Sequence, residues 1–386
     1  MSVAKLKVAH VVYSLSIGGV TNIVERLLRD KKEWQDLVLI VLADPDAALS
    51  EGYSCSRFNL NASIPDVYTL KGFLSIYFNP KKYFSAIVDD LVAIVETEKI
   101  NVFHFHGLPK DLPIGSLLQQ RVKDLKLVYT DHLMRIAEKE YSWLTIKILS
   151  RIYRKFYKPY HVIFVSKAIA NRAEELHIVN KRKYAEVIEN TVDLSRITQK
   201  TDYNCKGLFR IVYVSRISKV KGHFLLPEVA KILISKYQTT DFCFHLIGPG
   251  ELTESLQEQI NNMELGNKFL LEGPRSNVQE ILAGYDMALF PSEKEGLPVA
   301  LLEKMAAGMP VVASDIPEIK NVIQDPEEAL LFPVNDAAAC AAQLYRLMQD
   351  QQLRIKIGAT GRKAVENRYA ASLADRYAAF YKKLFE

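Results

Sequence analysis

Short β-rich runs alternate with amphipathic helical patterns along nearly all of the 386 residues. Alternation of this kind predicts βαβ units, in which the strands form parallel sheets and the helices cover their faces. The chain is also long for a single hydrophobic core, so two domains are expected. The predicted fold class is therefore α/β, with two Rossmann-like, doubly wound parallel-sheet domains.

The expected strands fall into two series separated by a polar break. They are residues 7–13, 37–42, 102–105, 127–130 and 162–165, followed by 209–214, 242–247, 269–271, 287–290 and 311–313. The polar stretch T-Q-K-T-D-Y-N-C-K-G lies between them, and a hinge is expected at 195–206. We therefore expect an N-terminal domain over 1–197, a C-terminal domain over 198–369 and an amphipathic helix over 370–386. Two such sheets would face each other across a cleft suited to a ligand.

Charge and cysteine usage narrow the possible partners and setting. The 50 basic and 45 acidic residues give a net charge of +5, too mild to indicate nucleic acid but suited to anionic substrates or an anionic membrane surface. Four scattered cysteines, without paired spacing, predict a reduced cytoplasmic setting with neither disulfides nor a zinc site. No run reaches the roughly 18 uncharged apolar residues that a membrane span needs. The short, β-branched N-terminal stretch predicts a first strand rather than a signal peptide.

The segment S-E-K-E-G-L-P-V-A-L-L-E-K-M-A-A-G-M-P, residues 292–310, carries two glutamates in a distinctive setting. Glu295 is expected in the loop after an apolar strand, and Glu303 about a turn inside the following helix. Such a loop brings a carboxylate and several helix N-terminal amides to the carboxyl end of the strand. A sugar nucleotide needs this mixture, because carboxylates bind its hydroxyls and free amides bind its phosphates.

Glycine-rich and basic loops follow other expected strands. Gly18 and Gly19 would let the backbone approach a phosphate at a helix N-terminus, although a tight turn without a ligand fits equally well. Arg216 and Lys221 share one loop and suit a diphosphate, whereas a basic loop in isolation would more often be merely solvated. The sequence I-G-P-G-E at 247–251 repeats the glycine-rich form. Because strand ends converge in an open α/β sheet, the joint occurrence of these loops indicates a phosphate-containing ligand.

Two histidine-bearing strands and one basic helix leave alternatives open. His104 and His106 alternate in V-F-H-F-H-G and face one side of a strand, but no cysteine or carboxylate at ligand spacing accompanies them, so no metal site is expected. His132 is a candidate for a polar role in the cleft, and the alternative is that this histidine is purely structural.

Residues 141–160 combine an apolar and a basic stripe. We expect this helix to pack by its apolar side, while contact with an anionic membrane remains the alternative.

Taken together, these motifs resemble the retaining glycosyltransferases of the GT-B fold, specifically the large family four. The resemblance extends over nearly the whole chain and is strongest in the element of residues 295–303. The loop around Arg216 and Lys221, the I-G-P-G-E turn and the N-T-V-D run at 190–193 also match. The final helix is similar to one that crosses back onto the N-terminal domain in this fold.

The resemblance implies a donor site by position. Its implied catalytic residues are His132 beside the transferred sugar, Arg216 and Lys221 on the leaving diphosphate, and Glu295 on the sugar hydroxyls. The other implied donor-binding residues are Gly18, Gly19, Gly273, Pro274, Arg275, Gly296, Leu297, Pro298, Val299 and Glu303. Of these, Glu303 would hold the ribose, and residues 273–275 would lie near the base. The sequence departs from the family pattern at Thr21, Thr191 and Ser215.

The implied activity is transfer of a hexose or N-acetylhexosamine from a UDP- or GDP-sugar to a saccharide or lipid-linked acceptor. Neither a metal nor a cofactor is expected. The implied setting is assembly of lipopolysaccharide, capsule or exopolysaccharide, in the cytoplasm or at the inner face of the membrane. Two alternatives remain open, namely an epimerase acting on the sugar nucleotide and a non-catalytic sugar-nucleotide-binding protein.

Overall fold

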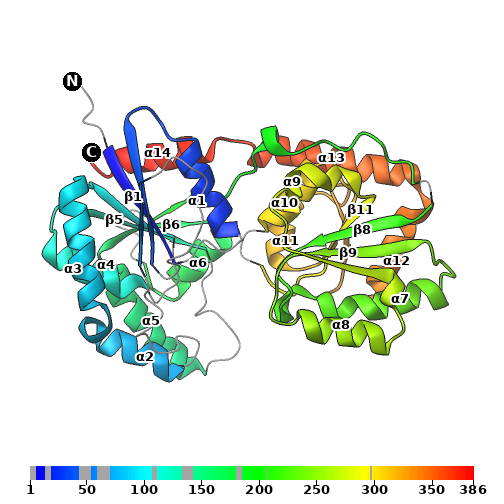
Figure 1. Cartoon of the computed structure of the whole chain (residues 1–386), viewed down its shortest axis with the longest axis horizontal. Coiled ribbons are helices and arrows are strands. Elements are labelled where there is room, and N and C mark those ends of the chain that lie inside the picture. The colour runs from blue at the N-terminus through cyan, green and yellow to red at the C-terminus, as the bar shows by residue number, and fades with distance from the viewer. Residues whose placement is uncertain are drawn as a thin grey trace. The chain divides into compact units, whose positions relative to one another are not determined.

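The computed structural model describes residues 6–13, 19–42, 54–58, 70–106, 111–132, 142–179, 185–205, 207–295 and 298–386. The chain forms two compact units (Figure 1), one made of Met1–Glu189 with Leu373–Glu386 and the other of Asn190–Ser372. The first division comes between Glu189 and Asn190, before the stretch in which the sequence predicted a hinge. The final helix belongs to the first unit although it follows the second in the chain.

The first unit is built on a seven-stranded parallel sheet, ordered β3-β2-β1-β4-β5-β6-β7. The strands are β1 (Leu6–Val12), β2 (Gln35–Val41), β3 (Ser54–Arg57), β4 (Val102–Phe105), β5 (Lys126–Asp131), β6 (Tyr160–Phe164) and β7 (Ala185–Val187). The parallel sheet confirms the βαβ prediction. The edge strands β3 and β7 were not predicted, because their S-C-S-R and A-E-V sequences contain no apolar run.

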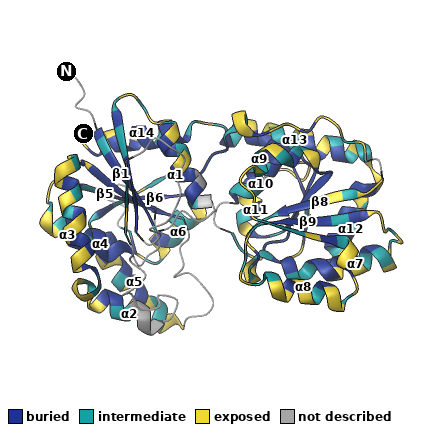
Figure 2. Cartoon of the chain, in the orientation of Figure 1, coloured by how far each residue is buried: buried dark blue, intermediate teal, exposed yellow. Residues whose placement is uncertain are grey.

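Two layers of helices cover this sheet. The helices α1 (Gly19–Arg29) and α14 (Leu373–Lys383) pack on one face, where Tyr377 and Tyr381 are buried. The other face is covered by α2 (Leu70–Phe78), α3 (Pro80–Glu98), α4 (Leu112–Arg121), α5 (Trp143–Tyr157) and α6 (Lys167–Glu175). Figure 2 shows the buried strands between helices whose outer sides are exposed. Successive strand residues alternate between the layers, so Val8 faces α14 while Ala9 faces the opposite layer.

The second unit repeats the architecture with a six-stranded parallel sheet, ordered β10-β9-β8-β11-β12-β13. The strands are β8 (Phe209–Val214), β9 (Phe242–Ile247), β10 (Phe269–Gly273), β11 (Met287–Phe290), β12 (Val311–Ser314) and β13 (Leu330–Phe332). The helices are α7 (Leu226–Ser235), α8 (Thr253–Asn262), α9 (Val278–Ile281), α10 (Val299–Ala306), α11 (Pro317–Val322), α12 (Ala337–Gln349) and α13 (Gln351–Tyr369). One continuous apolar core joins helices and sheet. None of the described helices is long and apolar enough to cross a membrane.

Both sheets reverse their strand order at one point, between β1 and β4 in the first unit and between β8 and β11 in the second. At such a point the connections leave the two neighbouring strands in opposite directions and open a crevice at their carboxyl ends. The loops that follow these four strands are therefore where a ligand is expected in each unit.

Candidate functional site

An ion pair occupies the reversal point of the second sheet. Lys221 lies on the connection after β8 and Glu295 on the loop after β11, and their Nζ and Oε1 atoms are 2.6 Å apart. The Glu295 side chain is only 8% exposed and that of Lys221 23%. The structure thus brings together two predicted site residues at a position where the fold favours a ligand.

Backbone packing explains why these two loops meet. Gly222 follows Lys221 with φ 70°, and a Cβ atom there would come within 2.0 Å of the Pro291 carbonyl oxygen. The amide of Glu293 donates to the carbonyl of Val220 at 2.9 Å. Only glycine permits so close an approach, so Gly222 allows the Lys221 loop to pack directly against the Glu295 loop.

The hydroxyl of Tyr213 provides a second link between the same loops. It donates to the carbonyl of Lys221 at 2.8 Å and lies 3.1 Å from the hydroxyl of Ser292. Tyr213 is fully buried, and burial raises the pKa of its hydroxyl. The hydroxyl therefore stays protonated and acts as a fixed support beneath the ion pair.

Arg216 lies on the same connection after β8, but its guanidinium forms no ion pair with a described carboxylate. Its side chain is exposed. Arg216 therefore offers a guanidinium to an anion at this edge, whereas Lys221 is already paired.

The glycines of the I-G-P-G-E turn support this loop. A Cβ atom on Gly248 would come within 2.2 Å of the Ser215 carbonyl oxygen, and one on Gly250 within 2.2 Å of the Ile217 carbonyl oxygen. The amide of Ile217 also donates to the Pro249 carbonyl at 2.8 Å. These glycines let the connection after β9 pack against the Arg216 loop.

Glu303 lies on α10, as predicted, about a turn from the helix start. Its Oε1 accepts a hydrogen bond from the Nε2 of Gln279 at 2.7 Å. Burial raises the pKa of Glu303, although Gln279 and the nearby charges of Lys304 and Arg196 oppose the rise. The α10 N-terminus has no side-chain cap, so the amides of Val299 and Ala300 face this edge without one. Gly296 and Leu297 lie outside the described residues.

Lys304 is a site-adjacent residue that sequence reasoning missed. Its ammonium donates to the Ala300 carbonyl at 3.0 Å and lies 5.2 Å from the Phe290 ring centroid. The side chain is buried, and burial lowers its pKa to about 8, against the attraction of Glu303 and Glu295. A lysine on a helix is expected in water, so only the structure reveals this buried cation beside both glutamates.

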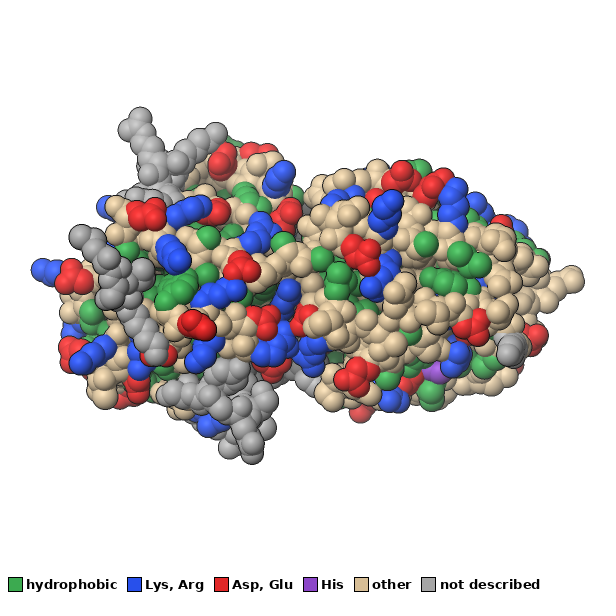
Figure 3. Space-filling model, turned by 90° about the horizontal axis from the view of Figure 1, so that it is seen from above, with side chains coloured by type: hydrophobic (Ala, Val, Ile, Leu, Met, Phe, Trp, Pro, Cys, Tyr) green, Lys and Arg blue, Asp and Glu red, His purple; other side chains and the backbone are tan. Residues whose placement is uncertain are grey.

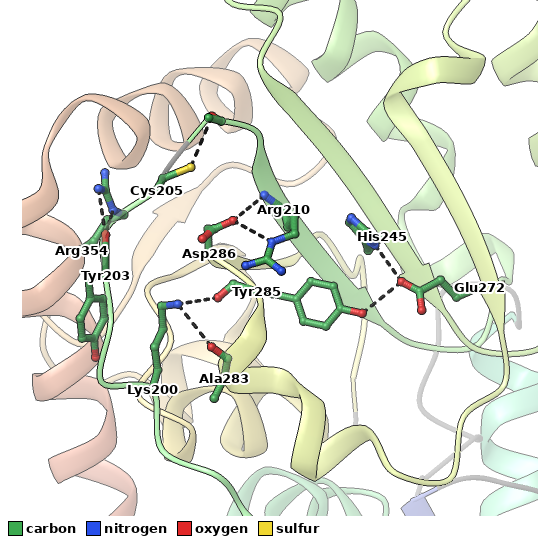
Figure 4. Close-up of polar contacts among 11 residues, drawn as sticks. Lys200, Tyr203, Cys205, Arg210, His245, Glu272, Ala283, Tyr285, Asp286 and Arg354 are labelled. Carbon is green, nitrogen blue, oxygen red and sulfur yellow. Dashed lines mark hydrogen bonds and ion pairs between the residues drawn. The ribbon is translucent and has the colours of Figure 1, made fainter.

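The turn after β10 holds the residues predicted near the base. Gly273 has φ 69° and precedes Pro274 and Arg275, whose guanidinium pairs with Glu272 at 2.6 Å. Figure 4 shows Glu272 also accepting from His245 at 2.8 Å and Tyr285 at 3.0 Å. Burial alone would raise the pKa of Glu272, but these hydrogen bonds and the charge of Arg275 outweigh it and lower the pKa.

The remaining contacts in Figure 4 are structural. The Lys200 ammonium donates to the Tyr285 carbonyl at 2.7 Å, and Arg210 pairs with Asp286 at 3.3 Å. These contacts hold Lys200 and Arg210 against the segment before β11. They stabilise the unit.

The first sheet carries a cluster of buried histidines near its own reversal point. His10 on β1 pairs in register with His104 on β4, and both share a face with His106. The ring centroids of His104 and His106 are 3.9 Å apart, which confirms that they point to one side. His10 was missed because its cross-strand register cannot be read from the sequence.

Hydrogen bonds already engage these rings. His10 Nδ1 lies 2.9 Å from His106 Nε2, while His104 contacts the Tyr381 hydroxyl at 2.5 Å and the Thr130 hydroxyl at 2.7 Å. One ligating atom from each of the three histidines lies within 4.8 Å of the others, so among the described residues these three form the group that could hold a metal. Both nitrogens of His104 are bonded to hydroxyls, however, and the group includes no carboxylate. The absence of a metal stays a prediction.

His132 directly follows β5 on the same face of the sheet. Its ring centroid is 5.8 Å from that of His106, and its Nε2 is buried with no hydrogen-bond partner among the described residues. Burial lowers the pKa of His132 to about 4. The imidazole is therefore neutral near pH 7 and has one nitrogen available to a ligand.

Gly18 lies outside the described residues, and Gly19 is the first residue of α1. The predicted helix after the glycine pair is therefore present. Of the predicted site residues, Arg216, Lys221, Glu295 and Glu303 lie around one sheet edge of the second unit, with residues 273–275 on the turn after β10. His132 and Gly19 belong to the first unit.

Comparison with known families covers most of the chain. The family model "Glycosyltransferase Family 4" matches residues 17–196, and the model "Glycosyl transferases group 1" matches residues 197–364. The two matches adjoin each other. The first includes β2 to β7 of the first sheet, and the second includes all six strands of the second sheet.

Similar proteins include enzymes with named activities and solved structures. N-acetyl-alpha-D-glucosaminyl L-malate synthase of Bacillus anthracis is 25% identical over 336 residues, covering 84% of this chain and 86% of that protein. The UDP-Gal:alpha-D-GlcNAc-diphosphoundecaprenol alpha-1,3-galactosyltransferase of Escherichia coli is 25% identical over 280 residues, covering 69% and 70%. Among solved structures, Anabaena HepE in complex with UDP and glucose superposes with a TM-score of 0.77 at 16% identity, over 98% of this chain and 100% of that one.

Proposed function

Since this chain belongs to the family-four glycosyltransferases and has their GT-B fold, we propose that it is a retaining, metal-independent hexosyltransferase. It would move a hexose or N-acetylhexosamine from a UDP- or GDP-sugar to a saccharide or lipid-linked acceptor. The setting would be surface polysaccharide synthesis. In this proposal the second unit binds the donor and the first unit serves the acceptor.

The observation that carries the proposal is the Lys221–Glu295 ion pair at the reversal point of the second sheet. Without a donor, each charge neutralises the other. A bound nucleotide sugar would give Lys221 a phosphate and Glu295 the sugar hydroxyls, so both charges would keep a partner after the pair opens. The free guanidinium of Arg216 and the uncapped start of α10 would add positive charge to the diphosphate.

The chemistry needs that charge. As the bond between the anomeric carbon and the phosphate oxygen breaks, negative charge grows on the nucleoside diphosphate, and fixed cations stabilise it. The acceptor oxygen would bond to the same face of the sugar, and the departing phosphate oxygen would take the acceptor proton. Glu295 would act as a binding group rather than a nucleophile, because its carboxylate would accept hydrogen bonds from the sugar hydroxyls once the pair with Lys221 opens. The neutral imidazole of His132 would contact the transferred sugar without adding charge.

The activities of the similar proteins support the substrate class. They include an N-acetyl-alpha-D-glucosaminyl L-malate synthase and a galactosyltransferase, and HepE was solved with UDP and glucose. The amylovoran transferase AmsK of Erwinia amylovora, 34% identical over 43% of this chain, supports polysaccharide synthesis. For these reasons we rank UDP-linked hexoses first among donors.

Two other activities would use the same donor site. An epimerase would convert the sugar nucleotide without any acceptor. A non-catalytic binding protein would bind the donor and release it unchanged. Arg216, Lys221, Glu295 and Glu303 together favour a transferase over a binding protein, because binding alone does not require two cations at the leaving group.

The test is a donor screen followed by product analysis. Nucleotide sugars are screened for thermal stabilisation, where a ligand at about 100 times its dissociation constant adds about 2.7 kcal/mol. The stabilising donor is then incubated with and without saccharide and lipid-diphosphate acceptors, and the products are analysed by mass spectrometry and NMR. We expect sugar transfer with the anomeric configuration of the donor retained. Conversion of the donor alone would identify an epimerase, and stabilisation without any product under all conditions would favour a binding protein.

A further inference from the structure

The outer face of α5 presents large apolar side chains to solvent. Trp143 is 72% exposed, Leu144 60% and Ile148 45%. They cluster at the N-terminal end of the helix, within two turns of one another. Grouping them on one helix end, rather than scattering them singly, indicates a surface that contacts something less polar than water.

These side chains are not needed to hold the helix in place. α5 is anchored by its opposite side, where Leu149, Tyr153 and Phe156 are buried against the first sheet's core. The ring of Tyr77 in α2 packs edge-to-face against Phe156 on this side as well, with the two ring centroids 4.6 Å apart. The helix therefore has two apolar sides, and only one of them is used by the fold.

The charge on the exposed side is entirely positive. α5 contains no acidic residue, and its exposed positions continue with Lys147, Arg151, Arg154 and Lys155, followed by Lys158. No carboxylate in the described part of the chain forms an ion pair with any of them. The Lys147 ammonium lies 4.7 Å from the Trp143 ring centroid, so charge and apolar surface are in direct contact. By contrast, the face drawn in Figure 3 mixes acidic and basic side chains.

The direction of α5 relates this surface to the sheet. α5 ends at Tyr157 and β6 begins at Tyr160, so the C-terminal end of the helix lies near the amino edge of the sheet. The helix has 15 residues and, at 1.5 Å per residue, spans about 22 Å. Its apolar N-terminal end therefore lies toward the carboxyl edge, the edge at which β5 leads to His132.

We propose that one exposed surface of α5 docks the protein on an anionic lipid bilayer. This α5 surface consists of Trp143, Leu144, Lys147, Ile148 and Arg151. Trp143, Leu144 and Ile148 enter the interfacial layer, where tryptophan is favoured because its ring is amphipathic. Lys147 and Arg151 contact lipid phosphates beside them. The carboxyl edge of the first sheet then faces the membrane, the side from which a lipid-linked acceptor would arrive.

The charge pattern favours lipid over other occupants. A second copy of this chain would bring two sets of cations together, which opposes pairing through this face. Nucleic acid would bind the cations, but its phosphate backbone would not bury three exposed apolar side chains at one helix end. Bilayer docking uses both components, and it does not depend on the proposed sugar-transfer activity.

The experiment uses the full chain and sedimentation with vesicles. One set contains phosphatidylcholine alone and the other an equal mixture of phosphatidylcholine and phosphatidylglycerol. We expect the wild-type protein to sediment with the mixed vesicles, to stay in the supernatant with the neutral ones, and to be released by raised salt. Lys147→Glu/Arg151→Glu should lower the binding constant about tenfold or more, and Trp143→Ser/Leu144→Ser should abolish binding even at low salt.

A matched variant tests whether binding depends on the α5 surface or on the positive charge of the protein in general. Lys231→Glu/Lys236→Glu makes the same charge change at two exposed positions on and just after α7, in the other unit, and should bind like the wild type. Circular dichroism and the temperature of thermal unfolding should be unchanged in all variants. The proposal is overturned if the wild type ignores mixed vesicles, if the α7 variant loses binding equally, or if the Trp143/Leu144 variant still binds. A fall in molecular mass for that variant would assign the surface to self-association instead.

Discussion

The two sheets share the strand order β2-β1-β4-β5 and β9-β8-β11-β12 around their reversal points, but their carboxyl edges carry different chemistry. The second edge holds charged groups, with Lys221 paired to Glu295 and Arg216 exposed. The first holds buried histidines whose pKa values burial lowers, so the rings are uncharged near pH 7. One architecture therefore carries a charged carboxyl edge in the second unit and an uncharged one in the first. In the proposed function, the charged edge binds the donor and the uncharged edge contributes the neutral imidazole of His132.

Breaking the charged edge should have the largest effect. Lys221→Ala removes the cation that meets the growing phosphate charge, and we expect turnover to fall about 10²-fold or more. Donor affinity should change much less. Steady-state kinetics with the donor found by screening provide the measurement, and Lys219→Ala is the matched control because Lys219 is exposed on the same connection. Equal rates for both variants would remove Lys221 from the chemistry.

Acid should distinguish the two units. The folded-state pKa of His10 is about 3 and that of His132 about 4, below the usual 6.5, because both rings are buried. As the pH falls from 6.5 to about 4, the unfolded chain binds protons that the folded unit excludes, so stability falls in this window. For His132 alone the difference of about 2.5 units corresponds to about 3 kcal/mol.

Hydrogen exchange followed by mass spectrometry over this pH range measures the effect in each unit separately. The first unit contains four such histidines, whereas in the second burial lowers the pKa of His223. We expect residues 6–12, 102–106 and 126–132 to lose protection before residues 209–290. Earlier loss in the second unit would contradict the assignment of neutral imidazoles to the first edge.

Glu303 tests the ribose end of the charged edge with a smaller expected effect. Glu303→Ala removes a charge-assisted hydrogen bond to the donor, so its dissociation constant should rise about tenfold, with turnover at saturation little changed. Isothermal titration calorimetry measures the affinity. Glu293→Ala changes an exposed glutamate in the loop before α10 and should bind donor like the wild type. If Glu303→Ala binds equally well, the ribose lies elsewhere.

The smallest effect is expected at Arg216. Arg216→Lys keeps the charge but loses the fork that can bind two phosphate oxygens at once, so donor affinity should fall only a few-fold. Affinity for the nucleoside diphosphate alone should fall equally, because the sugar is not involved. A change confined to the intact donor would place Arg216 near the sugar.

The sequence predicted elements whose signal is local. β4, β8, β9 and β11 have the predicted bounds, because each is an apolar run flanked by polar or turn residues. Lys221 and Glu295 were both assigned to the donor site by resemblance, yet their 2.6 Å contact depends on how Gly222 packs against Pro291. That contact joins loops far apart in sequence, so no local pattern predicts it.

Other features were hidden for similar reasons. The register of β1 against β4 sets His10 beside His104, and register is a property of the assembled sheet. Lys304 has the composition of a solvent-exposed helix residue but is buried beside Glu303. The edge strand β13 (Leu330–Phe332) is too short for its three residues to stand out from a loop.

The most direct test is a crystal structure with the stabilising nucleotide sugar bound. The Lys221 Nζ and Glu295 Oε1 atoms, 2.6 Å apart without donor, should separate beyond hydrogen-bond distance. Nζ should then lie on a diphosphate oxygen and Oε1 on a sugar hydroxyl. A closed Lys221–Glu295 pair, with the nucleotide bound away from the β8 and β11 loops, would contradict the account.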